Sequence, residues 1–132
     1  MVTSGGNPYA KYNNNKVFTA SKEELVLMLY DGSLKFLTQA ITYMEERDYE
    51  KANSTIIRLQ NILREFQVAL DDSYEISKDL YALYEYLHGR LIDANSRKDV
   101  AILTEVRGFM RALRDTWKEA MSIAKQQQEK GQ

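Results

Sequence analysis

The single histidine of this chain stands in the pattern Glu85-x-x-His88, by which helices of di-iron proteins supply metal ligands. Such a site takes this pair from each of two helices and adds two further glutamates, all facing the inside of a bundle. The chain has one histidine, and at 100° per residue His88 lies about 100° away from the middle of the apolar stripe on its own helix. We therefore expect no metal site and interpret His88 as a partly exposed histidine in a surface groove.

Other residues that carry chemistry are missing or lack a suitable context. The chain has no cysteine, which excludes disulfides and thiolate-bound zinc or iron–sulfur clusters. No serine stands in a nucleophile elbow, and no glycine-rich loop precedes a helix to hold a phosphate. We therefore expect no catalytic residue, no cofactor and no enzymatic activity.

The size and net charge of the chain exclude further classes of protein function. A chain of 132 residues suits one domain, and 18 basic against 19 acidic residues give a net charge of −1, without the basic footprint of a nucleic-acid binder. We interpret the basic line at Arg107, Arg111, Arg114 and Lys118 as a solvated helix face. No apolar run approaches the ~18 residues of a membrane span, and the N-terminus lacks the order of a signal peptide. We expect no nucleic acid, no membrane insertion and a cytoplasmic location.

Hydrophobic periodicity predicts a helix in each of four segments. The first begins at a capping box over Ser21–Glu24 and runs to about Glu46. The second is capped by Asp48 and runs to about Leu70. The third carries one apolar stripe up to Asn95, which we expect to end that helix in the left-handed conformation.

The fourth helix is capped within residues 96–99 and carries an apolar stripe that includes Ala120 and Ala124. We expect it to end at the glutamines of residues 126–128. Because the connections are short, consecutive helices are expected to be antiparallel neighbours. The predicted fold is all-α, an antiparallel up-down-up-down four-helix bundle. We divide the chain into a flexible N-terminal arm (1–16), the bundle domain (17–125) and a polar C-terminal tail (126–132).

Several apolar side chains lie away from the core stripes of their helices, and second stripes on adjacent helices can join into an exposed groove. We hypothesise that such a groove binds an amphipathic helix of a partner. Its expected members are Ile57, Val68, Tyr81, Tyr84, His88, Ile92, Ile102 and Phe109. The alternative is that these residues widen the core or form a homodimer face.

The N-terminal arm places aromatic residues in a polar context. We hypothesise that Tyr9, Tyr12 and Val17 form a displaceable cap that covers the groove when no partner is bound, and the alternative is a disordered tail without a role. Gly32 lies at the edge of the apolar face of the first helix, where alanine is intrinsically better by ~1 kcal/mol. A close approach of another helix is the simplest explanation for this glycine.

The segment TASKEELVLMLYDG at residues 19–32 resembles the TASPEELVLMLYDG signature of the flagellar export chaperones that bind flagellin. Lys22 stands where many members have proline, and either residue suits the first turn of a helix. Shorter blocks between residues 7–12 and residues 113–117 follow in the same order and spacing, so the resemblance covers almost the whole chain. The signature residues are Thr19, Ala20, Leu25, Met28, Leu29, Tyr30, Asp31 and Gly32.

The resemblance implies a cytoplasmic, ATP-independent chaperone that is not an enzyme and has a four-helix-bundle fold. Chaperones of this family hold the disordered C-terminal segment of flagellin, which wraps around the bundle. They thereby prevent premature polymerisation and present flagellin to the membrane-embedded flagellar export gate. The alternative function is a helical homodimerising structural or adaptor module that has no flagellin client.

Overall fold

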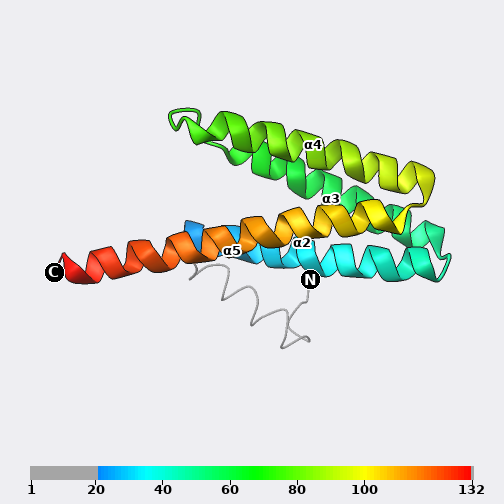
Figure 1. The fold of residues 1–132 in the computed structure, drawn as a ribbon, viewed down its shortest axis with the longest axis horizontal. Coiled ribbons are helices and arrows are strands. Elements are labelled where there is room, and N and C mark those ends of the chain that lie inside the picture. The colour runs from blue at the N-terminus through cyan, green and yellow to red at the C-terminus, as the bar shows by residue number, and fades with distance from the viewer. Residues whose placement is uncertain (1–20, 132) are drawn as a thin grey trace, which may run out of the picture.

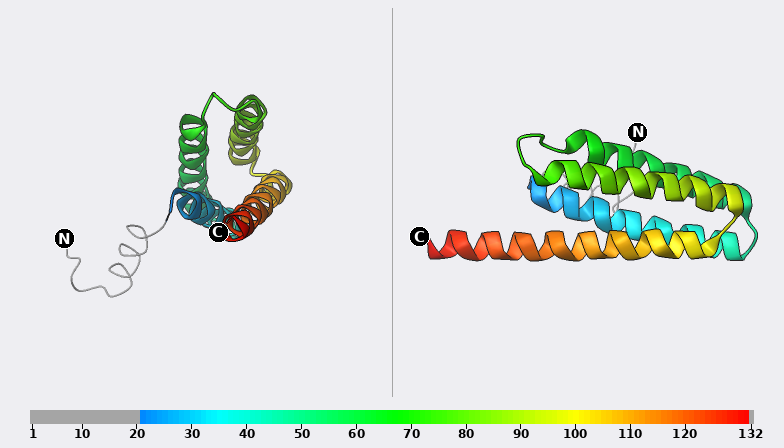
Figure 2. Two further views of the ribbon diagram at one scale, coloured as in Figure 1. Left: turned by 90° about the vertical axis from the view of Figure 1, so that its left-hand side faces the viewer. Right: turned by 45° about the horizontal axis from the view of Figure 1, so that its top comes forward.

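The computed structural model describes residues 21–131, which form four helices and no strand. The helices are α2 (Lys22–Glu45), α3 (Tyr49–Ala69), α4 (Ile76–Arg97) and α5 (Val100–Lys130). Connections of two to six residues join them, so each helix runs antiparallel to the next (Figure 1). Seen along its axis, the bundle has one helix at each corner, with α2 between α3 and α5 (Figure 2). The predicted four-helix bundle is confirmed.

Three predicted helix starts are confirmed by their hydrogen bonds. The Ser21 hydroxyl accepts from the backbone N–H of Glu24 at 3.2 Å and donates to the Glu24 carboxylate at 3.3 Å. The Asp48 carboxylate accepts from the backbone N–H of Lys51 at 3.3 Å. Asp99 caps α5 by accepting from the backbone N–H two residues further on at 2.9 Å. These side chains satisfy N–H groups that have no partner within the first helical turn.

The predicted end of the third helix is wrong. Asn95 lies inside α4, and the left-handed residue is Lys98, with φ 56°. The reason is tertiary: the Asn95 side-chain amide donates to the side-chain oxygen of Asn53 on α3 at 2.6 Å. With its amide engaged across the helix pair, Asn95 keeps its helical conformation and the helix continues for another turn.

The fourth helix is longer than the pattern indicates. α5 continues to Lys130 instead of dissolving at residues 126–128, and Ala120 and Ala124 are exposed instead of buried. The end of α5 extends beyond the other three helices, so its stripe has no neighbouring helix to pack against in the described part of the chain (Figure 1). Periodicity shows that a helix has an apolar face but not how far its partners reach.

Aromatic stacking fills part of the core, and a hydrogen bond and an ion pair hold α2 and α5 together. Phe66 lies between Tyr30 and Tyr84, with ring centroids 4.7 and 5.3 Å away. At one end of the helix pair, the indole N–H of Trp117 donates to the backbone carbonyl of Glu23 at 2.9 Å. The second contact between these helices is the ion pair of Arg114 on α5 with Asp31 on α2. None of the described helices is long and apolar enough to cross a membrane.

Candidate binding surface

The outer surface of α3 and α4 brings together five of the eight residues expected in the groove. Ile57 and Val68 lie on α3, and Tyr81, His88 and Ile92 lie on α4. The four apolar side chains among them are substantially exposed, at 45% for Ile57, 86% for Val68, 51% for Tyr81 and 47% for Ile92. His88 is half-buried, as expected for a groove histidine.

Three contacts fix how α3 and α4 face each other. The side chains of Asn53 and Asn95 meet at one end, as described above. In the middle, Arg64 Nη1 lies 2.6 Å from a carboxylate oxygen of Glu85. At the other end, the Gln67 side-chain amide donates to the backbone carbonyl of Tyr81 at 3.3 Å. This antiparallel register sets Ile57 level with Ile92, and Val68 level with Tyr81.

A shallow open cavity of about 460 Å³ lies at the Asn53 end of this surface. Apolar side chains of both helices form part of its wall, and amide side chains form much of the rest. Its lining residues are Asn53, Ile57, Gln60, Ile92, Asn95, Ser96 and Lys98. We call the whole surface, from this cavity to Val68 and Tyr81, the α3–α4 groove.

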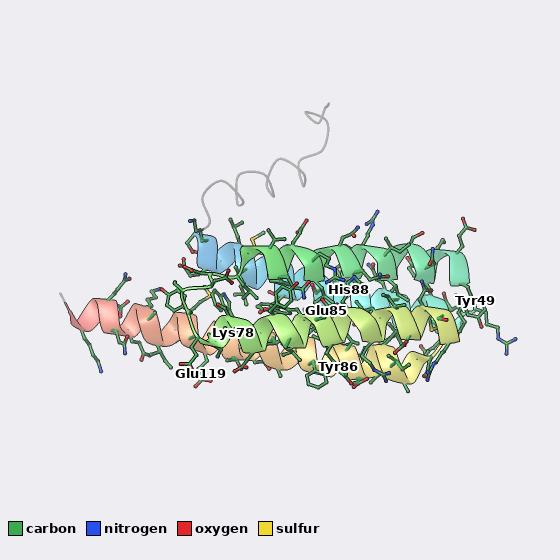
Figure 3. The ribbon with its side chains drawn as sticks, turned by 90° about the horizontal axis from the view of Figure 1, so that it is seen from above. Tyr49, Lys78, Glu85, Tyr86, His88 and Glu119 are labelled. Atoms are coloured by element: carbon green, nitrogen blue, oxygen red, sulfur yellow. The ribbon has the colours of Figure 1, made fainter. Side chains whose placement is uncertain are left out.

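A cluster of polar side chains occupies the middle of the groove (Figure 3). Arg64 donates to Gln67 at 2.7 Å, to Glu85 at 2.6 Å and to Nδ1 of His88 at 3.3 Å. Gln67 in turn donates to Glu85 at 3.1 Å. The hydrogen bonds from Arg64 and Gln67 lower the pKa of Glu85, so this carboxylate stays ionised. Burial, followed by the charge of Arg64, lowers the pKa of His88.

Glu85 and His88 both face this cluster, as Figure 3 shows, and neither points into the bundle interior that a di-iron site would occupy. Each is already paired with the Arg64 cation. Nor does any group of three or more acidic or histidine side chains gather within residues 21–131 in a way that would hold a metal ion.

The expected exposure of Tyr84 and Ile102 is wrong. Tyr84 is 3% exposed and Ile102 is 4% exposed, so both belong to the core. The Tyr84 hydroxyl lies 2.6 Å from that of Tyr30, on the diagonally opposite helix. Burial raises the pKa of both phenols, so both remain protonated. These two residues widen the core, which was the alternative interpretation.

Phe109 is exposed but lies on another surface, between α4 and α5. Its ring makes an edge-to-face contact with Tyr86, with centroids 6.1 Å apart. The Tyr86 hydroxyl donates to Glu105 at 2.6 Å, and Arg90 donates to the same carboxylate at 2.9 Å. Sequence reasoning missed Tyr86 here, because its partners Glu105 and Phe109 lie on another helix and the spacing within α4 does not show which side chains α5 places beside it.

The structure describes six of the eight signature residues, and these six differ in burial. Tyr30 is buried, and Asp31 accepts from Arg114 on α5 at 3.0 Å. Leu25 and Met28 are half-buried. The expected close helix approach at Gly32 is wrong, because a Cβ there would meet no described atom within 4 Å. Leu29, also a signature residue, is 37% exposed. The signature residues Thr19 and Ala20 and the cap residues Tyr9, Tyr12 and Val17 lie outside the described residues.

Comparison with known proteins decides the family. The model of the family described as Flagellar protein FliS matches residues 5–124. This chain belongs to the FliS family.

Curated relatives agree with the family match. The Flagellar secretion chaperone FliS of Bacillus subtilis is 42% identical over 115 residues, which cover 87% of this chain and 86% of that protein. The protein of the same name from Escherichia coli is 35% identical over 124 residues, or 91% of each chain. That of Salmonella typhimurium is 30% identical over 122 residues, or 89% and 90%. The resemblance to flagellar export chaperones is thus confirmed.

Proposed function

We propose that this FliS-family chain is a flagellar secretion chaperone that binds the C-terminal segment of flagellin, with the α3–α4 groove as one contact. The supporting observation is the four exposed apolar side chains that line this groove at two levels. The relatives from three organisms are named flagellar secretion chaperones, which supports a role in flagellar export. The chaperone acts in the cytoplasm, keeps flagellin from polymerising early and delivers it to the membrane-embedded export gate.

The size of the groove indicates a long client segment. Complete burial of an aliphatic or aromatic side chain contributes about 1.5–3 kcal/mol, so a half-exposed one has about 1 kcal/mol left to give. Four such side chains therefore supply about 4 kcal/mol, which corresponds to a Kd of about 1 mM before any ordering cost. A firmly held client must contact further surfaces, and Phe109 with Tyr86 offers one between α4 and α5.

Calorimetric titration of the full chain with a flagellin C-terminal segment tests the function, and Ile92→Asp tests the groove. A carboxylate at this position cannot be buried against an apolar client without a large desolvation cost, so we expect affinity to fall at least tenfold. Ile123→Asp is the matched control, since Ile123 is 48% exposed and lies near the free end of α5. It should change affinity less than threefold.

The melting temperature of both variants should stay near that of the unsubstituted chain, because both positions are at the surface. Equal affinity of Ile92→Asp and the parent chain would remove the groove from the binding surface. No binding by the parent chain, together with a dimer in sedimentation that Ile92→Asp dissociates, would instead support the homodimerising module.

A further inference from the structure

The exposed apolar residues of the α3–α4 groove form two levels with a fixed separation. Ile57 and Ile92 make the first level, and Val68 and Tyr81 the second. On each helix the two levels are eleven residues apart, and at 1.5 Å per residue they are separated by about 16.5 Å along the groove. A client segment that contacts both levels must present two apolar side chains with this separation on one face.

This separation discriminates between a helical and an extended client. Eleven residues of α-helix span about 16.5 Å and turn through about three complete turns, so residues i and i+11 share a face. In a β-strand at about 3.3 Å per residue, the same distance takes five residues, and residues i and i+5 point to opposite faces. The two levels therefore fit a helix lying along the groove.

The polar cluster between the two levels sets a further requirement. Side chains of Arg64 and Glu85 are 46% and 51% exposed, so water still reaches both although they are paired with each other. An apolar client residue placed over them would remove that water without replacing its hydrogen bonds. A polar client side chain displaces the same water but replaces its hydrogen bonds to Arg64 and Glu85. The Arg64–Glu85 pair lies four residues from the second level and seven from the first, counted along either helix.

The size of the groove argues for a single client helix instead of a second copy of this chain. A stable protein dimer uses roughly 20–30 residues on each side. The groove offers four apolar side chains and is bordered by exposed polar ones, among them Asn61 and Glu65 on α3 and Lys78 on α4.

We infer that the α3–α4 groove selects a helical client segment with apolar residues at i and i+11 and a polar residue opposite the Arg64–Glu85 pair. That polar residue is i+7 when i contacts the first level and i+4 when the client helix runs the other way, so polar residues at both positions suit either direction. This inference rests on the proposed function and adds the sequence pattern that the client must carry. The pattern reads the same in both directions, because i+4 and i+7 exchange places when the helix is reversed. In this assignment Arg64 and Glu85 are specificity-determining residues.

The test uses fluorescent helical peptides of about 20 residues, matched in helix content by circular dichroism, against the full chain. One peptide carries the pattern with leucine at the apolar and glutamine at the polar positions. A second has one alanine inserted before i+11, which rotates that leucine by about 100°. A third has leucine at all four positions. The unlabelled flagellin C-terminal segment serves as competitor.

We expect the patterned peptide to bind and to be displaced by the flagellin segment. The inserted and the all-leucine peptides should each bind about tenfold more weakly. The variant Arg64→Leu/Glu85→Leu should reverse the preference between the patterned and all-leucine peptides. Tighter binding of the all-leucine peptide to the unsubstituted chain, or equal binding of the inserted one, overturns the inference. If the flagellin segment binds but no peptide does, the inference fails and the proposed function stands.

Discussion

The hydroxyl pair between Tyr30 and Tyr84 provides a direct test of the packing of this bundle. Both side chains are buried, and their oxygens are 2.6 Å apart. Tyr84→Phe removes one hydroxyl and leaves the other buried without that partner, which costs about 1–3 kcal/mol. Removing both hydroxyls costs much less, because no polar group then remains unpaired. We therefore expect Tyr84→Phe to be destabilised and the double variant with Tyr30→Phe to recover most of the loss.

Urea unfolding followed by circular dichroism measures this coupling. With a denaturant slope of about 1–3 kcal/mol per molar, the single variant should shift the unfolding midpoint by about 1 M. Binding of the flagellin segment should stay unchanged, because Tyr84 lies inside the bundle. A double variant destabilised by the sum of the two single losses would show that the hydroxyls act independently. If Tyr84→Phe lost binding while its stability stayed unchanged, Tyr84 would be part of the binding surface and not of the core.

Two further predictions concern Gly32 and His88. Gly32→Ala should raise the free energy of unfolding by about 0.5–1 kcal/mol in thermal or urea unfolding, because the position is helical and no described atom lies within 4 Å of an added Cβ. A loss of stability would mean that something approaches this site closely. The pKa of His88 is lowered, so the unfolded chain binds more protons here than the folded one, and stability should fall as pH drops through the ordinary value of about 6.5. The charged groups facing His88 are Arg64 from α3 and Glu85 from α4, and Glu85, with its lowered pKa, stays ionised in this range. A client that covers the groove buries His88 further, so calorimetry should show weaker binding below about pH 6.5, and an unchanged pH dependence in His88→Gln would contradict this assignment.

The sequence predicted the helix caps, which depend on neighbouring residues, but not the contacts between helices. The caps at Ser21 and Asp48 depend on residues within one turn, and their side chains indicated them correctly. The cap of α5 was expected within residues 96–99, and the structure shows that Asp99 forms it. The end of α4 depends on a hydrogen bond between Asn95 and Asn53, which are far apart in the chain. No pattern within one helix reveals such a bond.

The candidate site shows the same division. Helical spacing placed Ile57 and Ile92 outside the core stripes, and both are exposed. The burial of Tyr84 depends on its diagonal partner Tyr30, and the width of a buried face depends on how many neighbours a helix has. The register that brings Arg64 to Glu85 likewise follows from the packing of α3 on α4.

The free end of α5 has a consequence for how this chain opens. From residue 122 onwards every described side chain is exposed, so these last turns are held by their own backbone hydrogen bonds. Such turns fray without the nucleus and packing that make the rest cooperative. Amide protons there should exchange with solvent far faster than those near Leu103 or Val106, which are buried in the same helix. One continuous helix thus combines a packed part, up to residue 121, with a shorter end that unfolds independently of it.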